Sequence, residues 1–293
     1  MRQESLKKDP LPPHPSQARG GALDGALGYD LPVNTGSTTG SVLVTGAARG
    51  IGLAIADLFL AGGWRVGMVD VDGDAVTEAA RGRTGAVPGV LDVRDADQWR
   101  ATLSRFCVDG RLDVLVNNAG VLASGPFADT DVEAHRRMVD VNLTGVVHGA
   151  ALGFPYLRRA DRGLLLNLCS ASALYGQPAL ATYGATKAAV KSLTEALELE
   201  WRADGVRVRS LIPLFVATDM AAVVAQGAAS VGRLGVRLTP QDVAAAAWRV
   251  VHERRVPLRG PHRAVGRQTK VLTAAAAVTP GWANRLVNAR LAR

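Results

Sequence analysis

From Ser41 to about residue 266, short apolar runs alternate with longer amphipathic stretches. This alternation is typical of a parallel sheet covered by helices, because strands buried on both faces are apolar throughout whereas the helices expose one side. The pattern predicts an α/β fold, with a Rossmann-like, doubly wound parallel sheet and helices on both faces, in a single domain. The predicted strands are Val42–Thr45, Arg65–Asp70, Val87–Asp92, Val114–Asn117, Leu164–Leu168 and Val206–Ile212.

Helices are predicted between these strands, near residues 51–61, 95–108, 131–158 and 184–203. A further helix is predicted to begin at Thr239, because a threonine N-cap, Pro240 in the first turn and Asp242 three residues on form a strong start signal. Its apolar stretch runs to about Val251. Two short helices are expected at 268–278 and 280–292, separated by Pro280 and Gly281.

The chain divides by composition into three parts. Residues 1–38 are rich in Pro, Gly, Ser and charge without a hydrophobic period, which predicts a flexible extension. Residues 39–267 form the predicted Rossmann-type domain, and residues 268–293 a basic helical tail. The net charge of +8 is concentrated near the C-terminus, where residues 254–293 hold nine Arg or Lys and no acidic residue. The favoured interpretation is a solvated basic end or a helix packed on protein, with docking on phosphate or anionic lipid as the alternative.

Several classes of protein are disfavoured by what the sequence lacks. No apolar run reaches the length of a membrane-spanning helix, and the polar start differs from a signal peptide, so a cytoplasmic protein is expected. Cys107 and Cys169 are too few for a disulfide framework and are expected to be buried. The five histidines form no convincing ligand cluster, so no metal site is predicted.

A glycine-rich segment, Thr45–Gly52, stands between the first predicted strand and its helix. Gly46 permits a sharp turn, Gly50 lets the backbone approach a pyrophosphate, and Gly52 allows the helix to pack close to the sheet. Free N–H groups at the helix start favour phosphate charge. In this strand–turn–helix context, the segment predicts a dinucleotide-binding site.

Asp70 ends the second predicted strand, where an acidic side chain can accept hydrogen bonds from both ribose hydroxyls of the adenosine. Its charge would repel a 2′-phosphate, so NAD(H) is favoured over NADP(H). Arg49 argues in the other direction, because a guanidinium in the glycine-rich loop could pair with a phosphate. An ordinary capping or loop carboxylate is the alternative interpretation of Asp70.

Tyr183 and Lys187 are spaced by four residues in a helical segment, so both side chains share one helix face. An adjacent ammonium favours the phenolate and brings the pKa of the phenol down from its usual value near 10. Such a phenol can donate a proton to a forming alkoxide or accept one in the reverse direction. A plain surface pair on a helix is the alternative.

These motifs together resemble the short-chain dehydrogenase/reductase family, in the branch with subunits of about 250 residues. The resemblance rests on the glycine-rich segment, on the sequence NNAG at Asn117–Gly120, and on Asn142, Ser170, Tyr183 and Lys187 in register. It extends from about Ser41 to Met220 at the level of motifs. The family resemblance implies a homodimer or homotetramer packed through the helices near 131–158 and 184–203.

The resemblance implies four catalytic residues. Tyr183 would be the acid/base, and Lys187 would lower its pKa and hold the nicotinamide ribose. Ser170 would bind the substrate oxygen together with Ser172 and Tyr183, and Asn142 would bind a water that links Lys187 to solvent. The expected cofactor-binding residues are Gly46, Arg49, Gly50, Ile51, Gly52, Asp70, Asp92, Val93, Asn118, Ala119, Gly120, Tyr183, Lys187, Pro213, Val216 and Thr218.

One departure from the family pattern is plain, since Leu214 follows Pro213 where the family usually has glycine. The backbone beside the nicotinamide is therefore expected to follow its own path. The segments after Ser170 and Pro213 are mainly apolar, which favours a hydrophobic alcohol or ketone over a sugar. The positions expected to face it are Ser172, Leu174, Tyr175, Gln177, Phe215, Met220, Val223 and Val224.

The sequence thus predicts an NAD(H)-dependent oxidoreductase that interconverts a secondary alcohol and a ketone. A non-catalytic protein that senses NAD(H) or holds a partner on the same fold is the alternative. Nucleic acid is not an expected partner, and peripheral membrane contact through the basic tail is a minor possibility.

Overall fold

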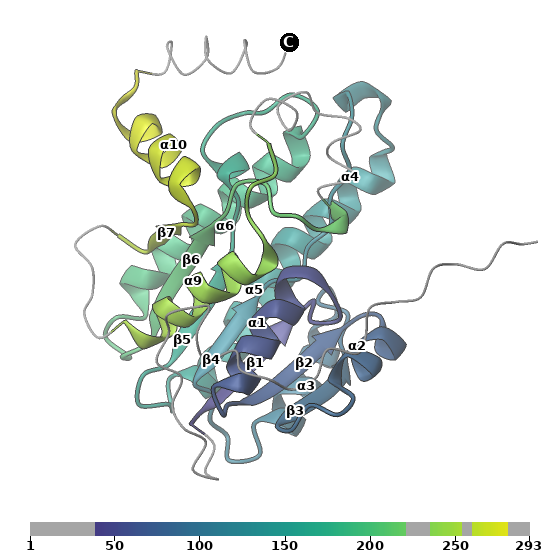
Figure 1. Cartoon of the computed structure of the whole chain (residues 1–293), viewed down its shortest axis with the longest axis vertical. Helices are drawn as coiled ribbons and strands as arrows, with labels where there is room; N and C mark the ends of the chain where they lie inside the picture. The colour runs from purple at the N-terminus through teal and green to yellow at the C-terminus, as the bar shows by residue number, and fades with distance from the viewer. Residues whose placement is uncertain (1–38, 221–234, 254–259, 281–293) are drawn as a thin grey trace, which may run out of the picture. The chain divides into compact units, whose positions relative to one another are not determined.

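Seven parallel strands form one sheet, in the spatial order β3-β2-β1-β4-β5-β6-β7 (Figure 1). The computed structural model describes residues 39–220, 235–253 and 260–280. The chain runs from β1 to one edge and then restarts at β4 on the other side, so the strand order reverses between β1 and β4. The strands are β1 Ser41–Thr45, β2 Arg65–Asp70, β3 Ala86–Val90, β4 Val114–Asn117, β5 Leu164–Leu168, β6 Arg207–Ile212 and β7 His262–Ala264.

Helices cover both faces of the sheet (Figure 1). On one face α1 packs against α9, and on the other α3 packs against α5 beside α6. The helices are α1 Gly50–Ala61, α2 Gly73–Ala80, α3 Ala96–Phe106, α4 Val132–Val139, α5 Gly145–Leu157, α6 Ala181–Glu200, α9 Pro240–His252 and α10 Arg267–Val278. This is the doubly wound arrangement predicted from the apolar pattern.

Apolar side chains fill the space between the sheet and each helical layer. Leu43, Leu115 and Leu165 on neighbouring strands are fully buried, and they belong to the same cluster as Trp99 of α3. On the opposite face, the Phe59 ring lies 5.2 Å from the rings of both Trp64 and Trp248, in edge-on contacts. Burial of such large side chains on both faces is the main force that holds helices onto a sheet.

All six predicted strands are present, and their ends differ from the predicted ends by at most two residues. The helix predicted over 131–158 is continuous, but it contains a π-helical segment, Asp140–Thr144, between α4 and α5. The helix start predicted at Thr239 is confirmed. It forms a capping box, in which the Thr239 hydroxyl accepts from the Asp242 N–H at 3.2 Å and the Asp242 carboxylate accepts from Thr239 N at 2.8 Å. The sequence analysis missed β7 and α2, since both are too short to show a periodic pattern.

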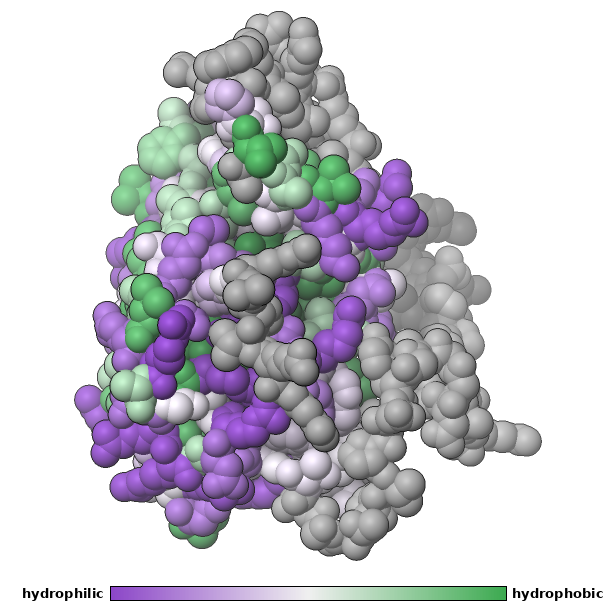
Figure 2. Space-filling view, turned by 90° about the vertical axis from the view of Figure 1, so that its left-hand side faces the viewer, coloured by the Kyte–Doolittle hydropathy of each residue, from purple (hydrophilic) through white to green (hydrophobic). Residues whose placement is uncertain are grey.

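The C-terminal part of the described chain is α10, which matches the helix predicted at 268–278. Thr269 is the buried residue among the described side chains of this helix, whereas Val271 and Val278 are 68% and 82% exposed. Figure 2 shows the side of the molecule that lies on the left in Figure 1. Hydrophobic side chains gather in its upper part, at the level of α10, and the lower part is mostly hydrophilic. The predicted extension 1–38, the predicted helix at 280–292, and Val223 and Val224 lie outside the described residues.

Both cysteines are buried free thiols, as predicted. Burial raises the pKa of Cys107 to about 12 and also raises the pKa of Cys169. Among the described helices, none combines the length and apolar character needed to cross a membrane.

Candidate functional site

A cavity of about 590 Å³ opens at the carboxyl ends of the strands. Ligands bind at this edge in open α/β sheets, beside the point where the strand order reverses. This cavity is lined by all the residues that the sequence analysis assigned to the cofactor and to catalysis, except Gly52 and Asn142. It is also lined by Ser172, one of the residues expected to bind the substrate oxygen. The structure therefore brings together side chains from segments more than 160 residues apart.

The glycine-rich segment forms a tight turn from β1 into α1. Gly46 and Gly50 have φ values of +66° and +56°, in the left-handed region that favours glycine. A Cβ on Gly52 would lie 2.1 Å from the Gly46 carbonyl oxygen, so only glycine allows the helix to approach the turn so closely. No side chain caps the start of α1, and its free N–H groups border the cavity. These features fit the pyrophosphate of a dinucleotide.

Asp70 lies at the end of β2, on the wall of the same cavity. Its two carboxylate oxygens accept hydrogen bonds from Ala48 N and from Asp72 N, both at 3.1 Å. These two backbone donors orient the carboxylate beside the glycine-rich turn. Each oxygen keeps a lone pair that could accept from a ribose hydroxyl.

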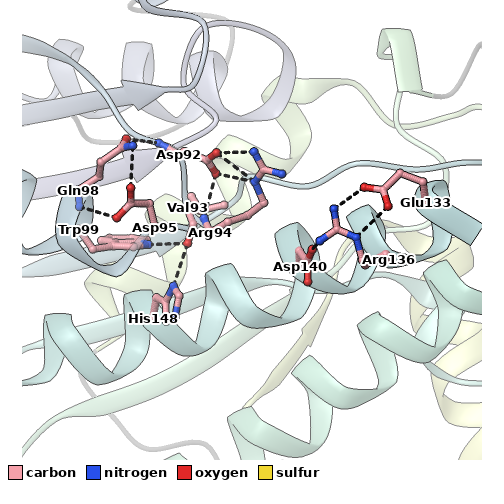
Figure 3. A network of polar contacts seen from close by, with 10 residues as sticks. All are labelled: Asp92, Val93, Arg94, Asp95, Gln98, Trp99, Glu133, Arg136, Asp140 and His148. Carbon is pink, nitrogen blue, oxygen red and sulfur yellow. Dashed lines mark hydrogen bonds and ion pairs between the residues drawn. The ribbon is translucent and has the colours of Figure 1, made fainter.

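Asp92 and Val93 follow β3 and line the next part of the cavity. Both belong to a network of polar contacts (Figure 3). Arg94 donates from Nε and Nη2 to the Asp92 carboxylate, with a shortest distance of 2.6 Å, and this pairing lowers the pKa of Asp92. The Val93 carbonyl oxygen is held by Trp99 Nε1 at 3.0 Å and by His148 Nδ1 at 3.2 Å. The backbone at this position is thus fixed from two neighbouring helices.

The segment that follows β4 is tied directly to the glycine-rich turn. Asn118 Nδ2 donates to the carbonyl oxygens of Thr45 and Gly46 at 2.8 and 3.1 Å. The Thr45 hydroxyl accepts from the backbone N–H groups of Asn118 and Ala119, each at 3.0 Å. Asn118 therefore fixes the segment after β4 against the glycine-rich turn after β1, at the point where the strand order reverses.

Asn142 lies in the π-helical segment, fully buried. Its Oδ1 accepts from Val121 N at 2.8 Å, and its Nδ2 donates to Val121 O at 2.8 Å and to Thr186 Oγ1 at 3.3 Å. A Cβ on Gly120 would lie 3.3 Å from Asn142 Oδ1 and 3.7 Å from Lys187 Nζ, so the three residues converge. The side-chain amide itself is occupied by protein partners.

Tyr183 and Lys187 lie on one face of α6, and both line the cavity. Lys187 Nζ is 5.8 Å from the centre of the Tyr183 ring and donates to the carbonyl oxygen of Leu168 at 2.9 Å. Ser170 follows β5, and its hydroxyl accepts from Ser172 N at 3.2 Å while interacting with the Tyr183 phenol. The phenol, the hydroxyl and the ammonium predicted to act together are therefore close in space.

The acidity of Tyr183 differs from the sequence-based expectation. Burial raises the pKa of its phenol to about 12, and the interaction with Ser170 opposes this shift more weakly. Burial also lowers the pKa of Lys187. The expected lowering of the phenol pKa by its neighbour is not met by these side chains alone, because the ammonium is directed at Leu168 and desolvation dominates.

The segment after β6 forms the remaining wall, with Pro213, Val216 and Thr218 at the cavity. Leu214 does not need the conformation of glycine, since Ala179 is the one non-glycine residue with positive φ in the described part of the chain. Leu214 packs instead on the cluster formed by Cys169, Ala171 and Ile212. Its side chain is thus accommodated beside the cavity.

The predicted substrate positions are only partly brought together. Ser172, Phe215 and Met220 line the cavity, and Leu174, Tyr175 and Gln177 do not. The Ser172 hydroxyl donates to Gln177 Oε1 at 3.2 Å, so Gln177 contacts a residue of the cavity wall without lining the cavity itself. The apolar wall also includes Leu122, Val141 and Leu180, which the sequence analysis did not name, and Leu214, which it named only as a departure from the family pattern.

The sequence analysis also missed charged residues at the cavity, namely Asp72, Arg94, Arg137 and Asp219. Asp72 is the N-cap of α2 and accepts from Ala75 N at 3.1 Å. The capping signal of an aspartate two residues after Asp70 could have revealed both this helix and its place at the cavity. No group of three or more His, Cys, Asp or Glu side chains is placed to hold a metal ion within the described residues.

Comparison with known proteins identifies the family of the chain. A family model described as short chain dehydrogenase matches residues 40–229, more than half of the chain. A 3-alpha-(or 20-beta)-hydroxysteroid dehydrogenase of Mycobacterium tuberculosis is 38% identical over 182 residues, 61% of this chain and 69% of the relative. An L-fucose dehydrogenase of Oryctolagus cuniculus is 38% identical over 227 residues, 70% of this chain and 76% of the relative.

A solved structure adds the same result at the level of the fold. The 3-ketoacyl-(acyl-carrier-protein) reductase of Brucella melitensis, complexed with NADH, superposes with a TM-score of 0.70 at 27% identity. The match covers 78% of this chain and 96% of the reductase. The fold and cavity define an oxidoreductase with a nicotinamide cofactor site. The chain belongs to the short-chain dehydrogenase family, whose members act on alcohols and ketones.

Proposed function

We propose that this protein interconverts a secondary alcohol and a ketone, with NAD(H) as the hydride carrier. The observation that carries the proposal is the convergence of Ser170, Tyr183 and Lys187 in one cavity with the uncapped start of α1. A proton donor and a dinucleotide site in one cavity are the two parts that carbonyl reduction requires.

The proton chemistry follows from the positions of the side chains. Tyr183, neutral at ordinary pH, donates its phenol proton to the oxygen of the forming alcohol, and Ser170 donates a hydrogen bond to the same oxygen. In the reverse direction the ionised phenol accepts the alcohol proton. Bound cofactor would supply the hydride in reduction, and in its oxidised form a positive charge beside the phenol.

Lys187 acts in this scheme as a binding and positioning cation. Its hydrogen bond to Leu168 O fixes the ammonium at the floor of the cavity, next to Gly120. From there it can hold the hydroxyls of the nicotinamide ribose. We assign to Asn142 the support of this floor, through its two hydrogen bonds to Val121 and its link to Thr186 on α6.

The preference for NAD(H) rests on Asp70. Its half-buried carboxylate, fixed by two backbone donors, can accept from ribose hydroxyls and would repel a 2′-phosphate. The Brucella reductase, similar in fold, is complexed with NADH. That likeness supports a nicotinamide dinucleotide, and the charge of Asp70 supports the non-phosphorylated form.

The apolar lining supports a hydrophobic substrate. Leu122, Leu180, Leu214, Phe215 and Met220 line the same cavity as Ser170 and Tyr183. Relatives of equal identity are named for a hydroxysteroid and for L-fucose, so the wall residues rather than the relatives carry this part of the proposal.

Assembly and location complete the proposal. We infer a cytoplasmic homodimer or homotetramer formed through α4, α5 and α6, on which Val132, Val147 and Leu199 are exposed. The domain would span 39–267, with 268–293 as a basic tail outside it. Sedimentation of the purified chain tests the assembly.

A substrate screen with both cofactors tests the proposed function. Purified protein is assayed by nicotinamide absorbance with hydrophobic and sugar-like alcohols and ketones, using NADH and NADPH in parallel. We expect turnover with NADH on a hydrophobic ketone, lost in Tyr183→Phe. Cofactor binding without any turnover would contradict the proposal and support the sensing or scaffold role instead.

A further inference from the structure

Two residues at the adenosine end of the cavity favour different cofactors. Asp70 places a negative charge where a 2′-phosphate would lie, whereas the Arg49 guanidinium could attract that phosphate. Both residues line the cavity, so the sequence motif alone does not resolve which one prevails.

The structure shows a third residue that acts on this balance. The Nη2 of Arg49 lies 2.6 Å from Oδ2 of Asp72, a carboxylate that also lines the cavity. The two side chains are 63% and 44% exposed, so the ion pair faces solvent and the cavity mouth. The positive charge of Arg49 is therefore matched by a carboxylate of the protein itself.

Asp72 is held in position from two sides. Its Oδ1 accepts from Ala75 N at 3.1 Å as the N-cap of α2, and its backbone N–H donates to Asp70 Oδ1 at 3.1 Å. A side chain fixed in this way offers its remaining oxygen to Arg49 at little entropic cost. The pair is thus better defined than most exposed ion pairs, which are usually weak.

We propose that Asp72 is a second determinant of cofactor choice, which holds Arg49 in an ion pair and so prevents it from binding a 2′-phosphate. This inference rests on the proposed function, because it concerns the selectivity of the same site. Asp70 and Asp72 both line the cavity beside Arg49, so two carboxylates stand against its guanidinium. An incoming phosphate dianion meets these two negative charges, and the guanidinium of Arg49 is already paired.

The substitution Asp72→Asn separates charge from structure. Asparagine is as good an N-cap as aspartate, so the start of α2 is preserved while the charge and the ion pair are removed. Arg49 is then free to make charge-assisted hydrogen bonds to a 2′-phosphate. Asp74→Asn is the matched control, since it removes a charge from the same turn at a residue without an ion pair among the described residues.

Calorimetric titration with ADP-ribose and with its 2′-phosphate tests the proposal without any need for turnover. We expect the wild-type protein to prefer ADP-ribose. Asp72→Asn should tighten binding of the 2′-phosphate by about tenfold, with less than about threefold change for ADP-ribose. Asp74→Asn should change both by less than about threefold, and Arg49→Ala/Asp72→Asn should lose most of the gain.

Each other result overturns a defined part of the inference. If Asp72→Asn brings no gain, or if the gain survives in Arg49→Ala/Asp72→Asn, Asp72 does not act through Arg49. Equal gains in Asp72→Asn and Asp74→Asn would reduce the effect to general charge and overturn the role of the pair. If the wild-type protein binds ADP-ribose but the variants do not behave as expected, the role of Asp72 is overturned and the proposed function stands. If the wild-type protein binds neither nucleotide, the role of Asp72 and the proposed function are both overturned.

Discussion

The ammonium of Lys187 donates to the carbonyl oxygen of Leu168 at 2.9 Å, and this hydrogen bond joins α6 to the end of β5. The lysine is 5% exposed, and burial lowers its pKa. A buried cation needs a fixed acceptor, and the carbonyl provides one without neutralising the charge. The ammonium therefore remains available to a ligand that enters the cavity beside Gly120.

Replacing this cation should separate binding of the two halves of the cofactor. In Lys187→Met we expect NADH affinity to fall by about tenfold and turnover by at least about a hundredfold. ADP, which lacks the nicotinamide ribose, should bind as before. Titration calorimetry with both ligands measures the difference. Lys191→Met is the control, since Lys191 lies one turn further along α6 and pairs with Glu195; equal losses in both variants would contradict the role of Lys187.

The raised pKa of Tyr183, about 12, predicts that alcohol oxidation and ketone reduction depend differently on pH. Alcohol oxidation needs the phenolate, so its kcat/KM should rise by about tenfold per pH unit below the apparent pKa. Ketone reduction needs the neutral phenol, which is fully present between about pH 6 and 9, so its rate should stay flat there. The charge of oxidised nicotinamide should move the apparent pKa below that of the free protein.

Initial rates in both directions across this range, at constant ionic strength, provide the measurement. Oxidation that is flat over the range, or reduction that increases with pH, would show that Tyr183 is not the titrating acid. Tyr183→Phe serves as the control, because any pH dependence left in it belongs to other groups.

A methyl group on Gly52 should disrupt the turn that holds the cofactor phosphates. In Gly52→Ala the new Cβ would lie 2.1 Å from the Gly46 carbonyl oxygen, against backbone that cannot move freely. We expect a loss of about 3 kcal/mol in the free energy of unfolding, together with loss of ADP binding. Thermal unfolding and calorimetry measure both effects. Gly176→Ala should leave the melting temperature nearly unchanged, because no atom lies within 4 Å of its added Cβ.

The capping box at the start of α9 should contribute to stability without acting on the cofactor site. In Thr239→Ala the Asp242 N–H loses its side-chain acceptor and keeps only the Thr239 carbonyl oxygen, and we expect a loss of about 1 kcal/mol in the free energy of unfolding. Thr239→Ser keeps the hydroxyl and should restore most of it. Urea unfolding of the three proteins tests this, and an alanine variant as stable as the serine variant would refute the role of the cap.

Local signals in the sequence were sufficient for most of the fold. Strands such as β4 and β5 were predicted within one residue of their ends, because strands buried on both faces are continuous apolar runs bounded by polar residues. The α9 start was predicted because Thr239 and Asp242 cap each other within one turn. The short helix α2 was missed, since eight residues carry too little periodicity to be recognised.

The candidate site divides in the same way. Gly46, Gly50 and Gly52 could be assigned from spacing, since the constraints on them act within one turn of chain. The pairing of Arg49 with Asp72 could not, because it joins residues 23 positions apart through the geometry of two strands. The commitment of the Asn142 side chain to Val121 and Thr186 was equally invisible.

The sequence by itself determined the order of the six strands β1–β6 and of the longer helices between them, the glycine turn and the placement of Tyr183 and Lys187 on one helix face. All of these depend on residues close together along the chain. Only the tertiary structure decided the acidity of Tyr183, the partner of Lys187 and the neutralisation of Arg49 by Asp72. These properties depend on burial and on charges contributed by distant segments, because desolvation and Coulomb interactions follow distance in space rather than position in the chain.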